Sequence, residues 1–174
     1  MMLLAVTVLC CGAAAGAEAA TKEHQIKAAF LYNFTKFITW PAQGEGAKEP
    51  FVIGVLGRNP FGNDLANIAR GRNVGGRQLL VVNLATVEEA RGVNLLFVPA
   101  GEEARLGNAL GSLHAASVLT VGESSRFAAL GGIITFSMAD DKIRFSINRE
   151  AGSRAGLKIS PQLLKLAISS RPGK

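Results

Sequence analysis

Apolar and polar positions along the chain predict one long helix near the start, followed by short segments with apolar runs. The helix is indicated by apolar residues at the i, i+3, i+4, i+7 spacing of a single face. That face comprises Ile26, Ala29, Phe30, Asn33, Phe34, Phe37 and Ile38. Thr21 is a candidate N-cap, and Trp40 with Pro41 should end the helix, because proline disfavours helical backbone in the residue before it. We expect the aromatic stripe of this helix to pack mainly into the core.

The remaining pattern alternates apolar runs with helical stretches. Expected strands are 51–57, 79–84, 94–99 and 117–122, and their continuous apolar character suits burial on both faces. Expected helices are 63–70, 86–91, 102–114, 124–130 and 162–169, with Ser160 capping the last and Pro161 at its first position. Segments 132–138 and 142–148 read as a hairpin around Ala139, Asp140 and Asp141. This order predicts an α/β fold with a mostly parallel sheet, helices on both faces and an antiparallel hairpin at the C-terminal edge.

The first residues form an apolar run, LLAVTVLCCGAAA, that is followed by two A-x-A patterns. This arrangement is typical of a secretory signal peptide and is too short for a membrane-spanning helix. We expect residues 1–20 to be a cleaved signal peptide and residues 21–174 to form a single domain in the periplasm. Cleavage would remove both cysteines, Cys10 and Cys11, so the mature chain would contain neither a disulfide nor a thiol nucleophile.

Composition and charge restrict the class of partner. Of 174 residues, 48% are hydrophobic, which is enough for a sizeable core. The formal net charge is +6 and the basic residues are dispersed. This charge leaves open an attraction to anionic membrane headgroups or to an acidic protein. Nucleic acid is not an expected partner, because the chain has one Trp, one Tyr and no recognition motif.

No catalytic pattern is visible. The chain has no G-x-G-x-x-G after its first strand, no P-loop, no H-E-x-x-H and no G-x-S-x-G. Its two histidines, His24 and His114, lie far apart, and His114 is expected to face solvent at a helix end or to interact favourably with the helix dipole. Asp140 and Asp141 fit a turn better than a pair of catalytic carboxylates. We therefore expect a binding protein, with no catalytic residues, no cofactor and no metal site.

Ligands of open α/β sheets bind beyond the carboxyl ends of the parallel strands. Arg58 and Asn59 follow the first expected strand and could hold a carboxylate or phosphate, with Phe61 packing a ring. The alternative is that this segment is a simple turn. Trp40, at a helix end, could stack a ligand or anchor a partner, and core packing is the alternative there.

Two long segments resemble a known family. Residues 23–41, EHQIKAAFLYNFTKFITWP, are similar to the opening helix of the YfiR/HmsC-type periplasmic proteins. Residues 131–167, GGIITFSMADDKIRFSINREAGSRAGLKISPQLLKLA, resemble their closing segment. Between them, FVIGVLG and VLTVGE lie where the family has its first and fourth strands. The resemblance extends over essentially the whole expected mature chain.

The resemblance implies a dimer-forming α/β protein that binds and represses an inner-membrane diguanylate cyclase. Repression would lower cyclic di-GMP and with it biofilm and exopolysaccharide output. It also implies an OmpA-like outer-membrane lipoprotein that sequesters the inhibitor, and in some members a small aromatic or anionic ligand. Better-known members carry disulfides that the expected mature chain lacks, so redox control is not expected here. The alternative is a periplasmic small-molecule-sensing module without a cyclase partner.

The hairpin and the segment after it are the candidate partner surface. An edge strand with alternating apolar and charged residues can dock another protein. The candidate residues are Arg144, Asn148, Arg149, Glu150 and Lys158. The alternative is that Arg144 and Lys158 only keep this edge soluble. Nearby apolar residues expected mainly in the core are Phe136, Phe145, Ile147, Leu163, Leu164 and Leu166.

Overall fold

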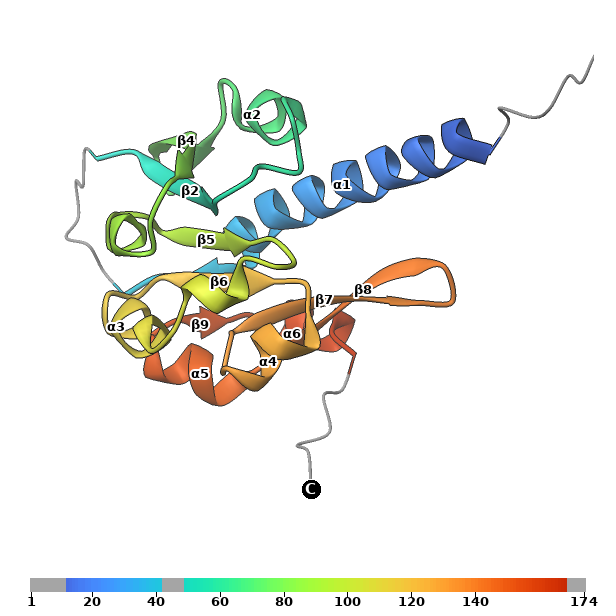
Figure 1. Cartoon of the computed structure of the whole chain (residues 1–174). Helices are drawn as coiled ribbons and strands as arrows, with labels where there is room; N and C mark the ends of the chain where they lie inside the picture. The colour runs from blue at the N-terminus through green and yellow to red at the C-terminus, as the bar shows by residue number, and fades with distance from the viewer. Residues whose placement is uncertain (1–11, 42–48, 169–174) are drawn as a thin grey trace, which may run out of the picture.

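The computed structural model describes residues 12–41 and 49–168, and it opens with one long helix, α1 (Gly12–Phe37) (Figure 1). Because α1 already includes residue 12, Thr21 lies inside the helix, and the expectation that Thr21 caps it is wrong. The first eleven residues of the expected signal peptide, with Cys10 and Cys11, lie outside the described residues. None of the helices that the structure describes is both long and apolar enough to span a membrane.

The predicted fold class is confirmed by a seven-stranded sheet of order β3-β4-β2-β5-β6-β7-β8. Its strands are β2 (Phe51–Leu56), β3 (Asn73–Val74), β4 (Arg77–Leu84), β5 (Leu95–Val98), β6 (Leu119–Gly122), β7 (Ile134–Ala139) and β8 (Lys142–Ile147). The five strands from β4 to β7 run parallel, while β3 and β8 are antiparallel to their neighbours. Asp140 and Asp141 form the β7–β8 turn with φ of 52° and 55°, as a two-residue type I′ hairpin requires.

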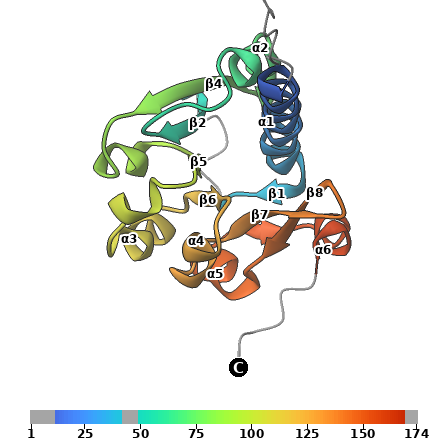
Figure 2. The same ribbon diagram turned by 45° about the vertical axis from the view of Figure 1, so that its right-hand side comes forward.

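Helices cover both faces of the sheet (Figure 2). They are α2 (Asp64–Ala69), the 3₁₀ helices η1 (Glu88–Gly92) and η2 (Glu103–Arg105), α3 (Ala109–Ala115), α4 (Ser125–Ala129), α5 (Arg149–Arg154) and α6 (Pro161–Leu166). One core cluster joins α1, α2, α5 and α6 to the sheet, and a second joins η1, α3, α4 and Leu106, which follows η2, to its other face. Ser124 and Ser160 cap α4 and α6 through their side chains.

The predicted face of the first helix is confirmed in part, since Phe34 and Ile38 are buried and Phe30 and Phe37 pack against the core. Leu31 and Phe34 are fully buried, whereas Ile26, Ala29 and Asn33 lie on the exposed side. Phe34 is surrounded by other rings, with its centroid 5.2 Å from that of Phe145. The expectation that the aromatic stripe packs mainly into the core is confirmed, and the spacing was wrong only for the three exposed positions.

Short elements account for the other differences. Ile38 leaves the helix in β1 (Ile38–Thr39), which pairs antiparallel with β9 (Lys158–Ile159) in a second, two-stranded sheet. The expected helix 102–114 is instead divided into η2 and α3, with Gly107 at φ 47° between them. Strand β3 and helix α5 were not predicted at all. Leu166, expected in the core, is 64% exposed.

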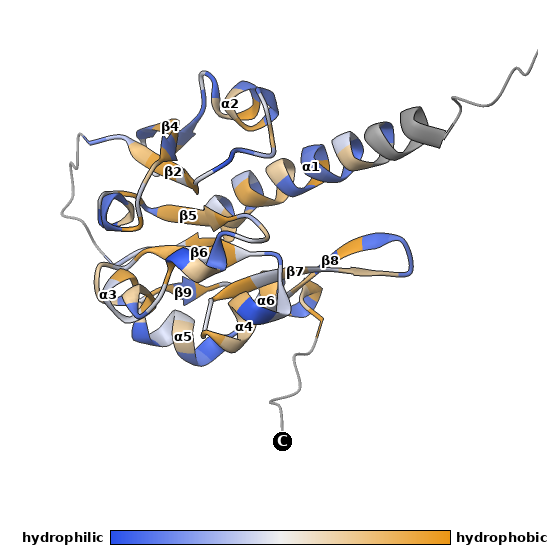
Figure 3. Cartoon of the chain, in the orientation of Figure 1, coloured by the Kyte–Doolittle hydropathy of each residue, from blue (hydrophilic) through white to orange (hydrophobic). Residues whose placement is uncertain are grey.

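Figure 3 shows hydrophobic central strands and a β7–β8 hairpin that becomes hydrophilic toward its tip. The first three residues of β7 are buried and its last three are exposed, so the hairpin extends beyond the core. In Figure 1 it projects on the same side as the N-terminal part of α1. The carboxyl ends of β5 and β6 point to this side as well.

Candidate functional site

Strand order places a crevice between β2 and β5. After β2 the chain continues to β4 on one side of β2, whereas β5 lies on the other side of β2 and continues to β6. The loops that follow β2 and β5 therefore lead in opposite directions. A cavity of about 420 Å³ lies at this point. We call it the carboxyl-end cleft, and its lining residues are His24, Arg58, Asn59, Pro60, Pro99, Ala100, Glu102 and Glu123. The structure therefore brings Arg58 and Asn59 beside the loops that follow β5 and β6.

The three predicted ligand residues after β2 have different environments. Arg58 is exposed at the cleft. The Asn59 side chain stabilises the local turn, because its Oδ1 accepts a hydrogen bond of 2.8 Å from the Phe61 N–H. Phe61 is buried, with its ring centroid 4.8 Å from that of Phe97. Of the three residues, Arg58 is thus the one whose side chain is exposed to bind an anion.

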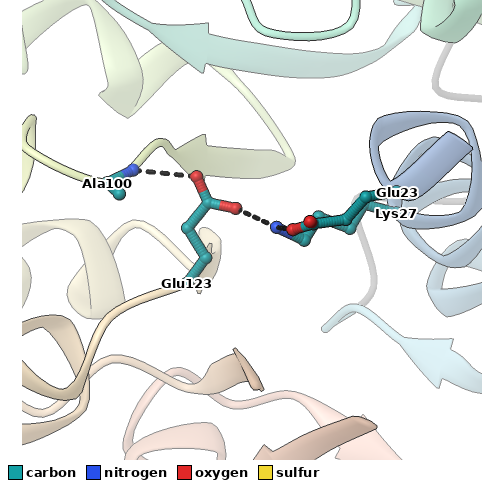
Figure 4. A network of polar contacts seen from close by, with 4 residues as sticks. All are labelled: Glu23, Lys27, Ala100 and Glu123. Carbon is teal, nitrogen blue, oxygen red and sulfur yellow. Dashed lines mark hydrogen bonds and ion pairs between the residues drawn. The ribbon is translucent and has the colours of Figure 1, made fainter. Parts of the chain in front are cut away.

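A buried ion-pair network closes one side of the cleft (Figure 4). Glu123 accepts a 2.9 Å hydrogen bond from the Ala100 N–H and pairs with Lys27, which also pairs with Glu23. The side chains of Lys27 and Glu123 are only 8% and 11% exposed. Burial alone would lower the pKa of Lys27, but its hydrogen bonds to Glu123 and Glu23 outweigh burial and raise it. The network fixes α1 against the loops after β5 and β6.

Sequence reasoning missed this network. The i, i+4 spacing of Glu23 and Lys27 was a visible signal for a local helix pair. The pairing of Lys27 with Glu123 joins residues far apart in the chain, and only the fold brings them together. Buried charges are tolerated when they are paired, which explains how Lys27 can lie on the buried face of α1.

Trp40 lies at a different site, beside the start of β2. It lines a cavity of about 460 Å³, which we call the tryptophan cavity, together with Tyr32, Phe51 and the cations Lys36 and Arg77. The indole donates a 3.0 Å hydrogen bond from Nε1 to the Asn94 carbonyl and packs edge-on against Phe51. No acidic side chain is among the described residues that line this cavity.

Two cations lie close to the Tyr32 ring in this region. The Lys36 Nζ and the Arg72 guanidinium carbon lie 4.4 Å and 4.5 Å from the centroid of its ring. A hydrogen bond to Arg72, helped by the charge of Lys36, lowers the pKa of the Tyr32 hydroxyl below its ordinary value. The tryptophan cavity thus combines aromatic walls with positive charge, the chemistry that suits an aromatic anion.

The predicted partner residues lie on β8, α5 and β9. Arg144, Arg149, Glu150 and Lys158 are exposed, whereas Asn148 caps α5 by accepting a 3.0 Å hydrogen bond from the Ala151 N–H. The outer edge of β8 is partly occupied, because the Phe145 carbonyl accepts a hydrogen bond from the N–H of Ile168. Strand addition at this edge is therefore restricted to the part nearer the hairpin tip.

Two other buried titratable groups lie outside these sites. His114 is 6% exposed, contrary to expectation, and its Nε2 has no hydrogen-bond partner within the described residues. Burial, followed by the charge of Arg154, lowers the pKa of His114. Glu103 is also buried, and its Oε2 accepts a 2.8 Å hydrogen bond from the Gly101 N–H. Within residues 12–41 and 49–168, no group of three or more His, Cys, Asp or Glu could hold a metal ion.

Comparison with known proteins gives one family and one shared fold. The family model described as YfiR/HmsC-like matches residues 24–168. A crystal structure of a conserved domain protein from Vibrio cholerae O1 biovar El Tor is similar, with a TM-score of 0.52 at 11% sequence identity. The similar region covers 85% of this chain and 60% of that protein, so the chain spans less than two thirds of its length, and the likeness concerns the fold alone. No curated protein matches the sequence.

Proposed function

Because the chain belongs to the YfiR/HmsC-like family over residues 24–168, we propose that it is a periplasmic inhibitor that binds and represses an inner-membrane diguanylate cyclase. Membership of this family indicates a periplasmic regulator of cyclic di-GMP signalling. Members of the family are regulators rather than enzymes. The observation that carries the proposal is the extent of the match, which runs from α1 to the residues after α6.

The proposed mechanism is binding without chemistry. An inhibitor lowers the activity of its target when it binds the inactive state more tightly than the active one. The proposed contact surface comprises Arg144, Asn148, Arg149, Glu150 and Lys158, where exposed cations lie beside apolar side chains. We further propose that residues 1–20 are removed on export, that residues 21–174 form one mature domain and a homodimer, and that an OmpA-like outer-membrane lipoprotein competes for the inhibitor.

Deletion of the gene tests this proposal. Cyclic di-GMP, measured by mass spectrometry in cell extracts, should rise in the deletion strain and return to its original level with the wild-type chain. A chain without residues 1–20 should fail to restore repression, because it would remain in the cytoplasm. Unchanged cyclic di-GMP in the deletion strain would refute the inhibitor function.

The tryptophan cavity supports a second candidate function, the sensing of a small molecule. Its volume of about 460 Å³ lies within the range of about 300–1,000 Å³ typical of small-ligand sites. Trp40 is the single tryptophan of the chain, so its fluorescence reports directly on the cavity. 4-Nitrobenzoate, a non-fluorescent aromatic anion, should quench this fluorescence and raise the melting temperature. Lys36→Gln should weaken both effects, whereas Lys142→Gln, on the hairpin, should leave them unchanged.

A further inference from the structure

A groove between α5, β9 and α6 carries two cations that form no ion pair within the described part of the chain. The groove has a volume of about 240 Å³ and is lined by Arg149, Ser153, Leu157, Lys158, Ile159 and Leu164. Arg149 and Lys158 are exposed, and the ion pairs of the described residues involve neither. The neighbouring acid, Glu150, is paired instead with Arg154, with 3.9 Å between the Glu150 Oε2 and the Arg154 Nη1. We call this feature the α5–α6 groove.

The walls of the α5–α6 groove are apolar between its cations. Leu157 is 5% exposed, and Ile159 and Leu164 are half-buried. The volume is smaller than the roughly 300–1,000 Å³ of typical small-ligand sites, so the groove fits individual side chains of a protein better than a free ligand. An apolar centre flanked by charge is the usual composition of a protein-binding patch.

Residues 169–174 are not complementary in charge to the groove. Residues 169–174, which follow Ile168, contain Arg171 and Lys174 and no acid. They carry the same sign of charge as the groove, and like charges placed together at an interface are unfavourable. The charge of the α5–α6 groove therefore favours an acidic segment over residues 169–174.

We infer that the α5–α6 groove receives an acidic, partly apolar segment from the periplasmic region of the diguanylate cyclase. Carboxylates of that segment would pair with Arg149 and Lys158, and an apolar side chain would pack between them on Leu157 and Leu164. This inference rests on the proposed function and adds to it the place and the chemistry of the contact. It assigns the roles of Arg149 and Lys158 to binding rather than to solubility.

Charge reversal in cells separates this inference from the proposed function. The double variant Arg149→Glu/Lys158→Glu, exported at the wild-type level, should lose repression and let cyclic di-GMP rise to the level of the deletion strain. Like-charge contacts of this kind weaken binding by roughly a hundredfold. The conservative variant Arg149→Lys/Lys158→Arg should still repress. A matched control, Arg70→Glu/Arg91→Glu, reverses two exposed cations elsewhere and should behave as wild type.

The outcomes are distinct. No rise in the deletion strain would refute the proposed function, and the groove assignment with it. A rise in the deletion strain, combined with full repression by Arg149→Glu/Lys158→Glu, would overturn the groove assignment alone. Loss of repression in the Arg70→Glu/Arg91→Glu control would also overturn it, because the effect would then follow net charge.

Zero-length cross-linking identifies the occupant. A carbodiimide condenses a lysine amine with a carboxylate to form an amide and itself takes up the water as a urea. In whole cells, Lys158 should become linked to an Asp or Glu of the cyclase periplasmic region, as located by mass spectrometry. Lys158→Arg should abolish the link and retain repression. Linkage of Lys158 to a second copy of this chain, or the absence of any link between Lys158 and the cyclase, would overturn the assignment.

Discussion

The buried pair of Lys27 and Glu123 gives a quantitative prediction about stability. Lys27→Met removes the ammonium that neutralises Glu123, whose side chain is 11% exposed. Loss of one partner of a buried ion pair costs about 3–5 kcal/mol. We expect a value near the lower limit, about 3 kcal/mol, because the Ala100 N–H continues to donate to Glu123.

The reciprocal change, Glu123→Gln, keeps the shape of the side chain and removes its charge. Lys27 would retain Glu23, which is 34% exposed, so its charge would not be left unpaired. The expected cost is about 2 kcal/mol, the size of a charged hydrogen bond. In the double variant the two losses should overlap, with a coupling energy of about 1–3 kcal/mol.

Urea unfolding followed by circular dichroism measures these free energies, provided that the slope with denaturant is the same in all variants. The matched control is the Glu150–Arg154 pair, whose side chains are 90% and 60% exposed at a separation of 3.9 Å. Its double-mutant cycle should give less than about 0.5 kcal/mol. A coupling energy for Lys27 and Glu123 as small as this control would refute the buried network.

Three further predictions concern the core, the acid response and the partner surface. Phe34→Ala should lower the free energy of unfolding by about 3–5 kcal/mol in urea titrations, because Phe34 is fully buried. Because the pKa of His114 is lower in the folded chain than its ordinary value of 6.5, the unfolded chain binds a proton more readily at this residue. The buried neutral imidazole therefore contributes to stability above pH 6.5, and this contribution is lost as the pH falls. In His114→Gln, the unfolding midpoint should change less between about pH 7 and pH 5 than in the wild type; an unaltered pH dependence would contradict this role. Arg144→Glu with Glu150→Arg should weaken co-purification of the cyclase without lowering the melting temperature, and unchanged recovery would remove these residues from the proposed surface.

The sequence allowed the fold class to be predicted because each long element has a strong local signal. The apolar runs that became β2, β5 and β6 are bounded by glycine, proline or polar residues, and the hairpin has a two-aspartate turn. Elements of two residues, such as β1, β3 and β9, show no periodicity, and their pairing is fixed by tertiary contacts. The break between η2 and α3 had one local signal, Gly107, but glycine also occurs within helices.

The candidate sites were predicted less completely. The rule that ligands bind at the carboxyl ends of parallel strands correctly placed Arg58 and Asn59 at the carboxyl-end cleft. It gave no indication that Phe61 would turn inward or that Lys27 would close the cleft from α1. Trp40 was singled out from its position at a helix end, but Arg77, which lines the same cavity, is brought there by β4.

The pairing of β1 with β9 has a consequence for biogenesis. Ile38 meets Ile159, more than a hundred residues later, so the strand that follows α1 cannot find its partner until almost the entire polypeptide has been synthesised. Contacts of such long sequence separation form slowly. A newly made chain therefore completes this two-stranded sheet only after β9 has been synthesised, which makes it one of the last parts of the fold to form.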